Sequence, residues 1–199
     1  FYNNTNLTRC IITDGVRLIH QYAFSSCLSL LELILPPSIE YVGKNAFSYN
    51  INLRRLIIMD GVQTIDDHAF GFCVRLPAVI IPPSIRWTGS YVFSNCENLT
   101  NVTIQDGVSQ VYIGAFYKCS ALPNITIPSS ITRIHNNTFT YCDNLTLVQL
   151  PNTILSIGGS AFAYTTALPS ITIPASCSKI EDYAFRGSSI TEVRFEGNV

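Results

Sequence analysis

Phenylalanine occupies every twenty-third position along this chain of 199 residues, without a slip in register. The nine members of the series are Phe1, Phe24, Phe47, Phe70, Phe93, Phe116, Phe139, Phe162 and Phe185. A strict period of this length is typical of a solenoid, in which each repeat forms one coil. A unit this short cannot bury its own apolar face, so each coil must pack against its neighbours.

Each interval between these phenylalanines repeats one apolar pattern. Leucine lies six residues after the phenylalanine in eight coils, and apolar residues lie nine and eleven after it, as in Leu33 and Leu35. Two inward side chains separated by one outward residue are typical of a short β-strand. Stacked coils would place these strands side by side as a parallel sheet, about 4.8 Å apart.

The expected strand is followed by a turn of two alternating kinds. Up to residue 150, every second coil carries Asp-Gly, as in Asp60-Gly61, and the coils between carry Pro-Pro-Ser or Pro-Ser-Ser, as in Pro36-Pro37-Ser38; the alternation fades beyond it. Glycine supplies the positive φ that a tight turn needs. A second apolar pair follows, and then an Ala-Phe segment for which we expect a helical or 3₁₀ turn. The alternation indicates duplication of a 46-residue double unit.

The combined pattern is Leu-x-x-Leu-x-Ile-Pro-x-x-Ile-x-x-Ile-Gly-x-x-Ala-Phe-x-x-Cys-x-x-Leu, and residues 30–47 and 125–142 match it nearly position by position. It resembles the BspA-like class of leucine-rich repeats over the whole chain. The resemblance implies a right-handed solenoid, an arc or rod with a parallel β-sheet on its concave face and short strands or 3₁₀ turns on the other side. We expect one domain over residues 1–199, with about nine coils, as part of a longer array. Ile190, Val193 and Phe195 depart from the register by one residue, so the last coil is degenerate.

The resemblance also carries expectations about function. Members of the class are commonly surface or secreted proteins of bacteria and protozoan parasites, and those studied resemble adhesins. It therefore implies a non-catalytic module at the cell surface or outside the cell, which binds a host or partner protein, or a glycan, through the concave face. Two alternatives stay open: a structural protein whose coils stack end to end into a filament, and an intracellular scaffold.

Composition and charge exclude other classes. The chain is 47% apolar and 13% charged, which indicates a packed core rather than disorder. Its net charge of −1, without a basic cluster, argues against nucleic-acid binding. The longest apolar runs fall far short of the roughly 20 residues that a membrane-spanning helix needs.

The cysteines also follow the repeat. Five of the seven lie three residues after a phenylalanine, at Cys27, Cys73, Cys96, Cys119 and Cys142. Stacking would bring neighbours of this column within disulfide range. We nevertheless expect buried free thiols, because the position belongs to an inward column that suits small apolar side chains. There is no Cys-x-x-Cys, so the sequence does not indicate a zinc site.

No arrangement of residues indicates catalysis or a cofactor. His20 and His135 share a coil position but lie five coils apart, and His68 lies elsewhere in its coil. Aspartates of the Asp-Gly turns repeat every second coil, roughly 10 Å apart, which is too far to share one ion. The sequence therefore predicts no catalytic residue, no metal site and no cofactor.

The outward strand positions, eight and ten residues after each phenylalanine, form the candidate binding face. Its first half is a stripe of isoleucines flanked by charges, and its second half is polar. The predicted partner-binding residues are Arg9, Ile11, Glu32, Ile34, Arg55, Ile57 and Ile80. Aligned apolar residues on a solvent face often mark a contact surface. The alternative is that isoleucine occurs here only because it favours strands.

Asparagine sequons indicate that the chain enters the secretory route. Asn-x-Ser/Thr occurs at Asn3, Asn6, Asn98, Asn101, Asn124, Asn136 and Asn144. We expect secretion, with glycans covering the C-terminal half of the face. The alternative is that duplication copied Asn-Leu-Thr without any glycan being attached.

Overall fold

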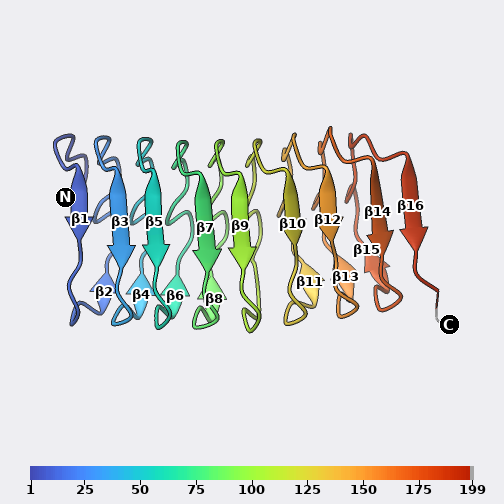
Figure 1. The fold of residues 1–199 in the computed structure, drawn as a ribbon, viewed down its shortest axis with the longest axis horizontal. Coiled ribbons are helices and arrows are strands. Elements are labelled where there is room, and N and C mark those ends of the chain that lie inside the picture. Colours follow the sequence, from blue (N-terminus) through green and yellow to red (C-terminus); the bar gives the residue numbers. More distant parts are fainter. Residues whose placement is uncertain (198–199) are drawn as a thin grey trace.

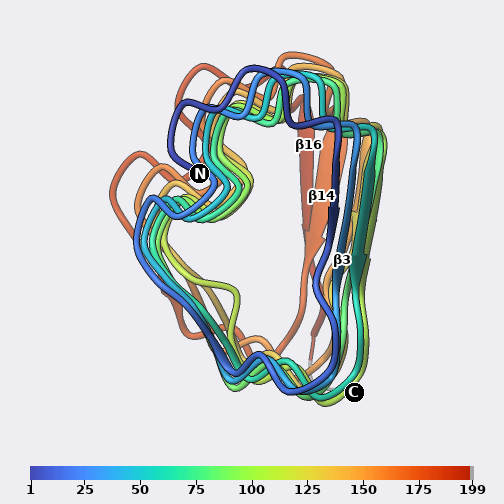
Figure 2. The same ribbon diagram turned by 90° about the vertical axis from the view of Figure 1, so that its left-hand side faces the viewer.

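The computed structural model describes residues 1–197, which form a row of stacked coils made of short strands and turns. Figure 1 shows the coils following one another in chain order, with the two ends of the chain at opposite ends of the row. Seen along the row, the coils superimpose as one closed outline (Figure 2). The solenoid expected from the repeated phenylalanines is confirmed.

Each coil contributes a front strand, and most contribute a shorter back strand. The front strands within residues 1–197 are β1 (Arg9–Ile11), β3 (Glu32–Leu35), β5 (Arg55–Ile58), β7 (Ala78–Ile81), β9 (Asn101–Ile104), β10 (Asn124–Thr126), β12 (Leu147–Gln149), β14 (Ser170–Ile173) and β16 (Glu192–Phe195). The back strands are β2 (Leu18–Ile19), β4 (Tyr41–Val42), β6 (Thr64–Ile65), β8 (Trp87–Thr88), β11 (Arg133–Ile134), β13 (Ser156–Ile157) and β15 (Lys179–Ile180).

All strand pairs are parallel and join equivalent positions of neighbouring coils. Leu33 of β3 pairs with Leu56 of β5, one full period later. The exception is the last pair, in which Ser170 of β14 pairs with Glu192 of β16, one residue short of a full period. This confirms the one-residue departure that the sequence predicts for the last coil, whose front strand is exposed along its whole length.

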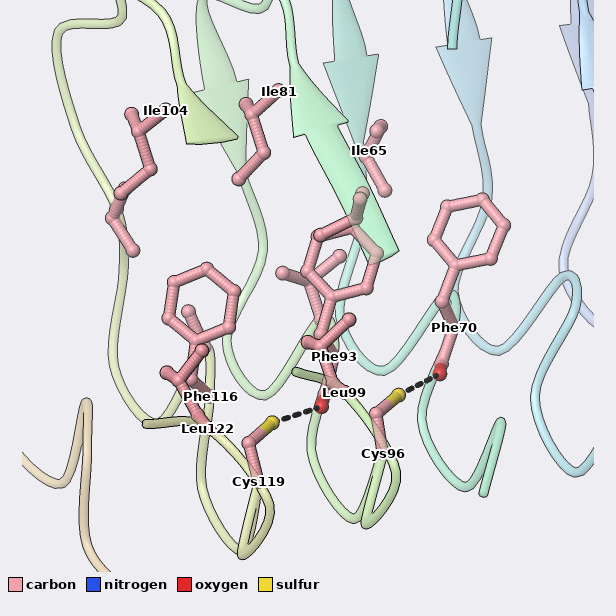
Figure 3. Close-up of a cluster of buried hydrophobic side chains, with 14 of the residues drawn as sticks. Ile65, Phe70, Ile81, Phe93, Cys96, Leu99, Ile104, Phe116, Cys119 and Leu122 are labelled. Atoms are coloured by element: carbon pink, nitrogen blue, oxygen red, sulfur yellow. Dashed lines mark hydrogen bonds between the residues drawn. The ribbon is translucent and has the colours of Figure 1, made fainter. Parts of the chain in front are cut away.

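The core is a set of columns that run along the row. The rings of the repeated phenylalanines stack nearly parallel, and those of Phe47 and Phe70 lie 5.5 Å apart at an angle of 4°. The repeated leucines from Leu30 onward are fully buried beside them (Figure 3). Because every coil has phenylalanine at the same position, each ring packs against the phenylalanine rings of the neighbouring coils.

The Ala-Phe segment does not form the expected helical or 3₁₀ turn. In the coils after the first, the residues two before and two after the phenylalanine have positive φ, as Tyr22 (57°) and Ser26 (60°) do around Phe24. A left-handed residue ends a right-handed helical turn, so only isolated turns form. The backbone instead pairs between coils: the amide of Phe24 donates to the carbonyl oxygen of Ala46, 2.8 Å away.

Hydrogen bonds between coils explain the alternation of Asp-Gly and Pro-Pro-Ser turns. The amide of Gly61 donates to Ser84 Oγ at 2.8 Å, and the amide of Gly107 donates to Ser130 Oγ at 3.1 Å. Gly61 has a φ of 120°, and a Cβ there would lie 2.6 Å from the Pro37 carbonyl oxygen. The preceding proline-rich turn thus leaves room only for glycine at Gly61, and the serine of the following turn satisfies its amide.

The cysteine column is buried, as predicted, and each thiol has a defined partner. Cys96 Sγ donates to the carbonyl oxygen of Phe70 in the preceding coil at 3.4 Å, and Cys119 Sγ to that of Phe93 at 3.3 Å (Figure 3). Within residues 1–197 the cysteines are free thiols. Burial raises the pKa of Cys73 to about 12 and raises those of Cys96, Cys119 and Cys142 in the same direction.

Candidate binding face

The predicted binding residues lie on one exposed face of the front sheet. Strand pairing aligns Arg9 with Glu32 and Arg55, and aligns Ile11 with Ile34 and Ile57. Ile80 occupies the same outward position on β7, in the next coil (Figure 1). The outward residues alternate with buried ones along each strand, as the sequence pattern predicts.

The isoleucines of this face are not equally exposed. Ile11 is 62% exposed and Ile80 is 54% exposed. Ile34 and Ile57 are half-buried. Ile11 and Ile80 therefore expose more apolar surface than the two middle isoleucines do.

A charged triad lies beside the isoleucines. Arg9 Nε lies 3.3 Å from Glu32 Oε2, and the Arg55 guanidinium binds the other oxygen of the same carboxylate. The Glu32 side chain is only 21% exposed, whereas both arginine side chains remain largely exposed. Exposed ion pairs contribute about 1 kcal/mol at most, so the triad adds little stability. It orients two guanidinium groups outward with one carboxylate between them, which leaves a net positive charge.

Two further apolar residues extend this surface and were missed from the sequence. Leu31, just before β3, is 46% exposed, and Met59, just after β5, is 42% exposed. Other coils carry mainly proline, threonine or another polar residue at these two positions. Leu31 and Met59 could therefore have been found from the sequence, because each is an apolar exception at a coil position that otherwise holds proline or a polar residue. We call the surface formed by Ile11, Leu31, Ile34, Ile57, Met59 and Ile80 the isoleucine face.

The second half of the front sheet is polar, as predicted. Its outward residues include Asn101, Asn124 and Thr126, and Thr126 Oγ1 lies 2.6 Å from Gln149 Oε1. Leu147 is the exception, with 51% of its surface exposed. All seven asparagines of the sequons are exposed, namely Asn3, Asn6, Asn98, Asn101, Asn124, Asn136 and Asn144.

The histidines and turn aspartates do not assemble into a site. Within the described part of the chain, no three His, Cys, Asp or Glu residues are close enough together to hold a metal ion. His68 stacks on Tyr91 at 5.2 Å and His135 stacks on Tyr112 at 4.7 Å, so both imidazoles take part in packing between coils. Residues 1–197 contain no helix that is long and apolar enough to span a membrane.

Comparison with known proteins agrees with this architecture. The sequence profile of the BspA type leucine rich repeat region matches residues 1–122 and 87–199, in six copies. A leucine-rich repeat protein of T. pallidum is 31% identical, with a TM-score of 0.72 over 79% of this chain and 74% of that protein. Another, from Eubacterium ventriosum, is 30% identical, with a TM-score of 0.77 over 87% of this chain and 47% of that protein.

More distant structures share the fold. The pneumococcal vaccine antigen PcpA is 20% identical, with a TM-score of 0.56 over 92% of this chain and 55% of the antigen. No curated protein sequence gives a significant match. The repeated coils, the parallel front sheet and the match over the whole sequence lead to one conclusion. The chain belongs to the BspA-type leucine-rich repeat family.

Proposed function

We propose that this chain is a non-catalytic protein-binding module that contacts its partner through the isoleucine face. The observation that carries the proposal is the exposure of Ile11 on β1 and of Ile80 on β7, at 62% and 54%, with exposed Leu31 and Met59 next to the strands between them. Contiguous exposed apolar surface that is bordered by charge is typical of protein interfaces. Arg9 and Arg55 border this surface, and arginine is enriched at such contacts.

The proposed setting is the cell surface or the extracellular space, with the chain acting as an adhesin. Membership in the family supports a role in protein interaction. A structural neighbour from Faecalibacterium prausnitzii, 21% identical and with a TM-score of 0.54, is described as a leucine rich cell surface protein. The exposed sequon asparagines are consistent with passage through a secretory route in which glycans are added.

Two substitutions of equal exposure test the binding face. Ile80, on the isoleucine face, and Leu155, beside back strand β13, are each 54% exposed. We expect Ile80→Ser to weaken binding to purified extracellular matrix proteins or to host-cell surfaces by about tenfold, as loss of an interface anchor does. Leu155→Ser should leave the same binding unchanged. Equal effects of the two variants would contradict the proposed face.

The glycan part of the proposal has a separate test. We propose that glycans at Asn101 and Asn124, which lie on neighbouring coils of the front sheet, leave the isoleucine face as the open half. Intact mass of the natively produced protein, before and after glycosidase treatment, measures this directly. An unchanged mass would remove the support that the sequons lend to secretion, and it would leave the binding face itself untouched.

A further inference from the structure

The back of the solenoid is interrupted at one coil. The short back strands form two sheets, β2-β4-β6-β8 and β11-β13-β15, and the coil between them contributes no back strand among the described residues. Its back segment spans residues 108–113. In Figure 2 one yellow-green coil runs closer to the interior on this side than its neighbours do.

Thr88 accounts for the interruption. The core position that it occupies, eighteen residues after the phenylalanine, holds isoleucine or valine in the other coils. Thr88 is 1% exposed, so its hydroxyl must find a partner inside the protein. It accepts a hydrogen bond from the amide of Tyr112 at 3.3 Å.

This bond replaces a regular one. In the intact parts of the ladder, the amide one residue further along the coil donates to the carbonyl oxygen of the core residue in the preceding coil. The pairs are Gly43 to Ile19 (2.7 Å), Asp66 to Val42 (2.8 Å), Gly89 to Ile65 (2.6 Å), Gly158 to Ile134 (2.7 Å) and Glu181 to Ile157 (2.9 Å). The structure of residues 1–197 has no such bond at Tyr112 or at His135.

Two backbone amides beside the break have no hydrogen-bond acceptor. Arg86 and Leu155 each donate to the equivalent residue of the preceding coil, at 2.9 and 2.8 Å. The equivalent amides of Ser109 and Thr132 have no hydrogen-bond acceptor within the described residues, and neither has that of Gln63, where the ladder is intact. An unpaired amide beside a recess is a ready donor to a bound anion.

A cavity of about 250 Å³ lies at this break. Its lining residues are Ser109, Gln110, Thr132, Arg133 and His135, and we call it the back pocket. Every lining side chain can donate a hydrogen bond, and none is a carboxylate. The ring of Tyr112 stacks on His135 at 4.7 Å, and Trp87 lies beside Tyr112, with ring centroids 6.3 Å apart.

The charge of the back pocket comes from Arg133. Burial and the nearby Arg133 lower the pKa of His135, so its imidazole is neutral at pH 7. Glu181 lies two coils further along, where it binds Lys179 Nζ at 2.9 Å and accepts a hydrogen bond from the amide of Gly159 at 3.2 Å. Its carboxylate still acts on the pocket, because it opposes the lowering of the pKa of His135, and Arg133 helps to lower the pKa of Glu181 itself. The guanidinium of Arg133 forms no ion pair within residues 1–197.

We propose that the back pocket binds a small oxyanion-bearing ligand of about the size of an acidic monosaccharide. The guanidinium of Arg133 donates two parallel hydrogen bonds to the oxyanion, as it does to a carboxylate or sulfate. The hydroxyls of Ser109 and Thr132 and the amide of Gln110 bind polar groups of the same molecule. This site lies on the back of the coils, away from the isoleucine face, so it is independent of the proposed protein-binding role.

Calorimetric titration of the intact chain with sodium glucuronate, sodium sulfate and glucose, at constant ionic strength, tests the proposal. We expect saturable glucuronate binding and none of neutral glucose. Arg133→Gln should weaken glucuronate binding by about tenfold or more. Lys179→Gln is the matched control, since Lys179 holds the position of Arg133 two coils further along, in β15, where the ladder is intact. This variant should bind glucuronate as tightly as the unmodified chain.

The outcomes separate the sources of the oxyanion. Tighter binding of glucuronate than of sulfate supports an acidic sugar, and equal binding supports a small oxyanion of any kind. The proposal is wrong if neither ligand binds at up to about 20 mM, or if Arg133→Gln binds as tightly as the unmodified chain.

A second variant tests the origin of the pocket. Thr88→Val keeps the shape of the side chain and removes the hydroxyl that captures the Tyr112 amide. We expect this amide to pair with the carbonyl of residue 88, so that its hydrogen exchange slows and glucuronate binding falls as in Arg133→Gln. Full binding by Thr88→Val would contradict the role assigned to the broken ladder.

Discussion

Alkaline pH should unfold this protein through its buried thiols. Burial raises the pKa of Cys73 from 9.0 to about 12 in the folded state. Because the folded pKa is the higher one, the stabilisation is fully present below pH 9 and is lost as the pH rises toward 12. Each pH unit in this window removes about 1.4 kcal/mol per thiol from the free energy of unfolding.

The other buried thiols of the cysteine column add to this loss of stability at alkaline pH. The pKa values of Cys96, Cys119 and Cys142 are raised by burial in the same direction. Their contributions add to that of Cys73, so the free energy of unfolding should fall more steeply with pH than a single thiol would make it fall. We therefore expect a loss of folded structure as the pH rises from 9 toward 12.

Urea denaturation at pH 8, 9, 9.5 and 10, followed by circular dichroism, measures this pH dependence. Cys73→Ala is the comparison, and its free energy of unfolding should fall by about 1.4 kcal/mol less per pH unit above pH 9. The variant also controls for tyrosine titration, including that of Tyr41, whose pKa the hydrogen bond to Asp66 raises to about 12. Identical slopes for the two proteins would refute the argument.

Three further predictions concern stability and can be measured by urea denaturation at pH 7. Phe93→Ala removes one ring from the stacked column and should cost about 3–5 kcal/mol, against less than about 0.5 kcal/mol for the exposed Leu155→Ser. Gly61→Ala should be more destabilising than Gly15→Ala, because both have positive φ but only at Gly61 would the Cβ strike the backbone of the preceding coil. Ser84→Ala leaves the Gly61 amide without its acceptor and should cost about 1–3 kcal/mol; an unchanged midpoint would show that water replaces the hydroxyl.

The repeat alone determined most of the architecture. A strict period with alternating inward residues predicts stacked coils, a parallel sheet and buried columns of phenylalanine, leucine and cysteine, and all are present. These features follow from spacing, since residues one period apart must meet in neighbouring coils. The alignment of Arg9, Glu32 and Arg55 on one face was predictable for the same reason.

Features that depend on what a single residue does to its neighbours were decided by the tertiary structure. Positive φ on both sides of each phenylalanine after the first replaces the expected helical turn, because alternate amides there, such as that of Phe24, pair with the next coil rather than along their own. Ile34 and Ile57 are half-buried whereas Ile11 and Ile80 are exposed, a difference that the period does not specify. Thr88 breaks the back ladder because a buried hydroxyl must be paired, and its donor is an amide that the ladder would otherwise use. A period specifies which residues meet, whereas the hydrogen bonds and the packing space of the folded coil decide how they do so.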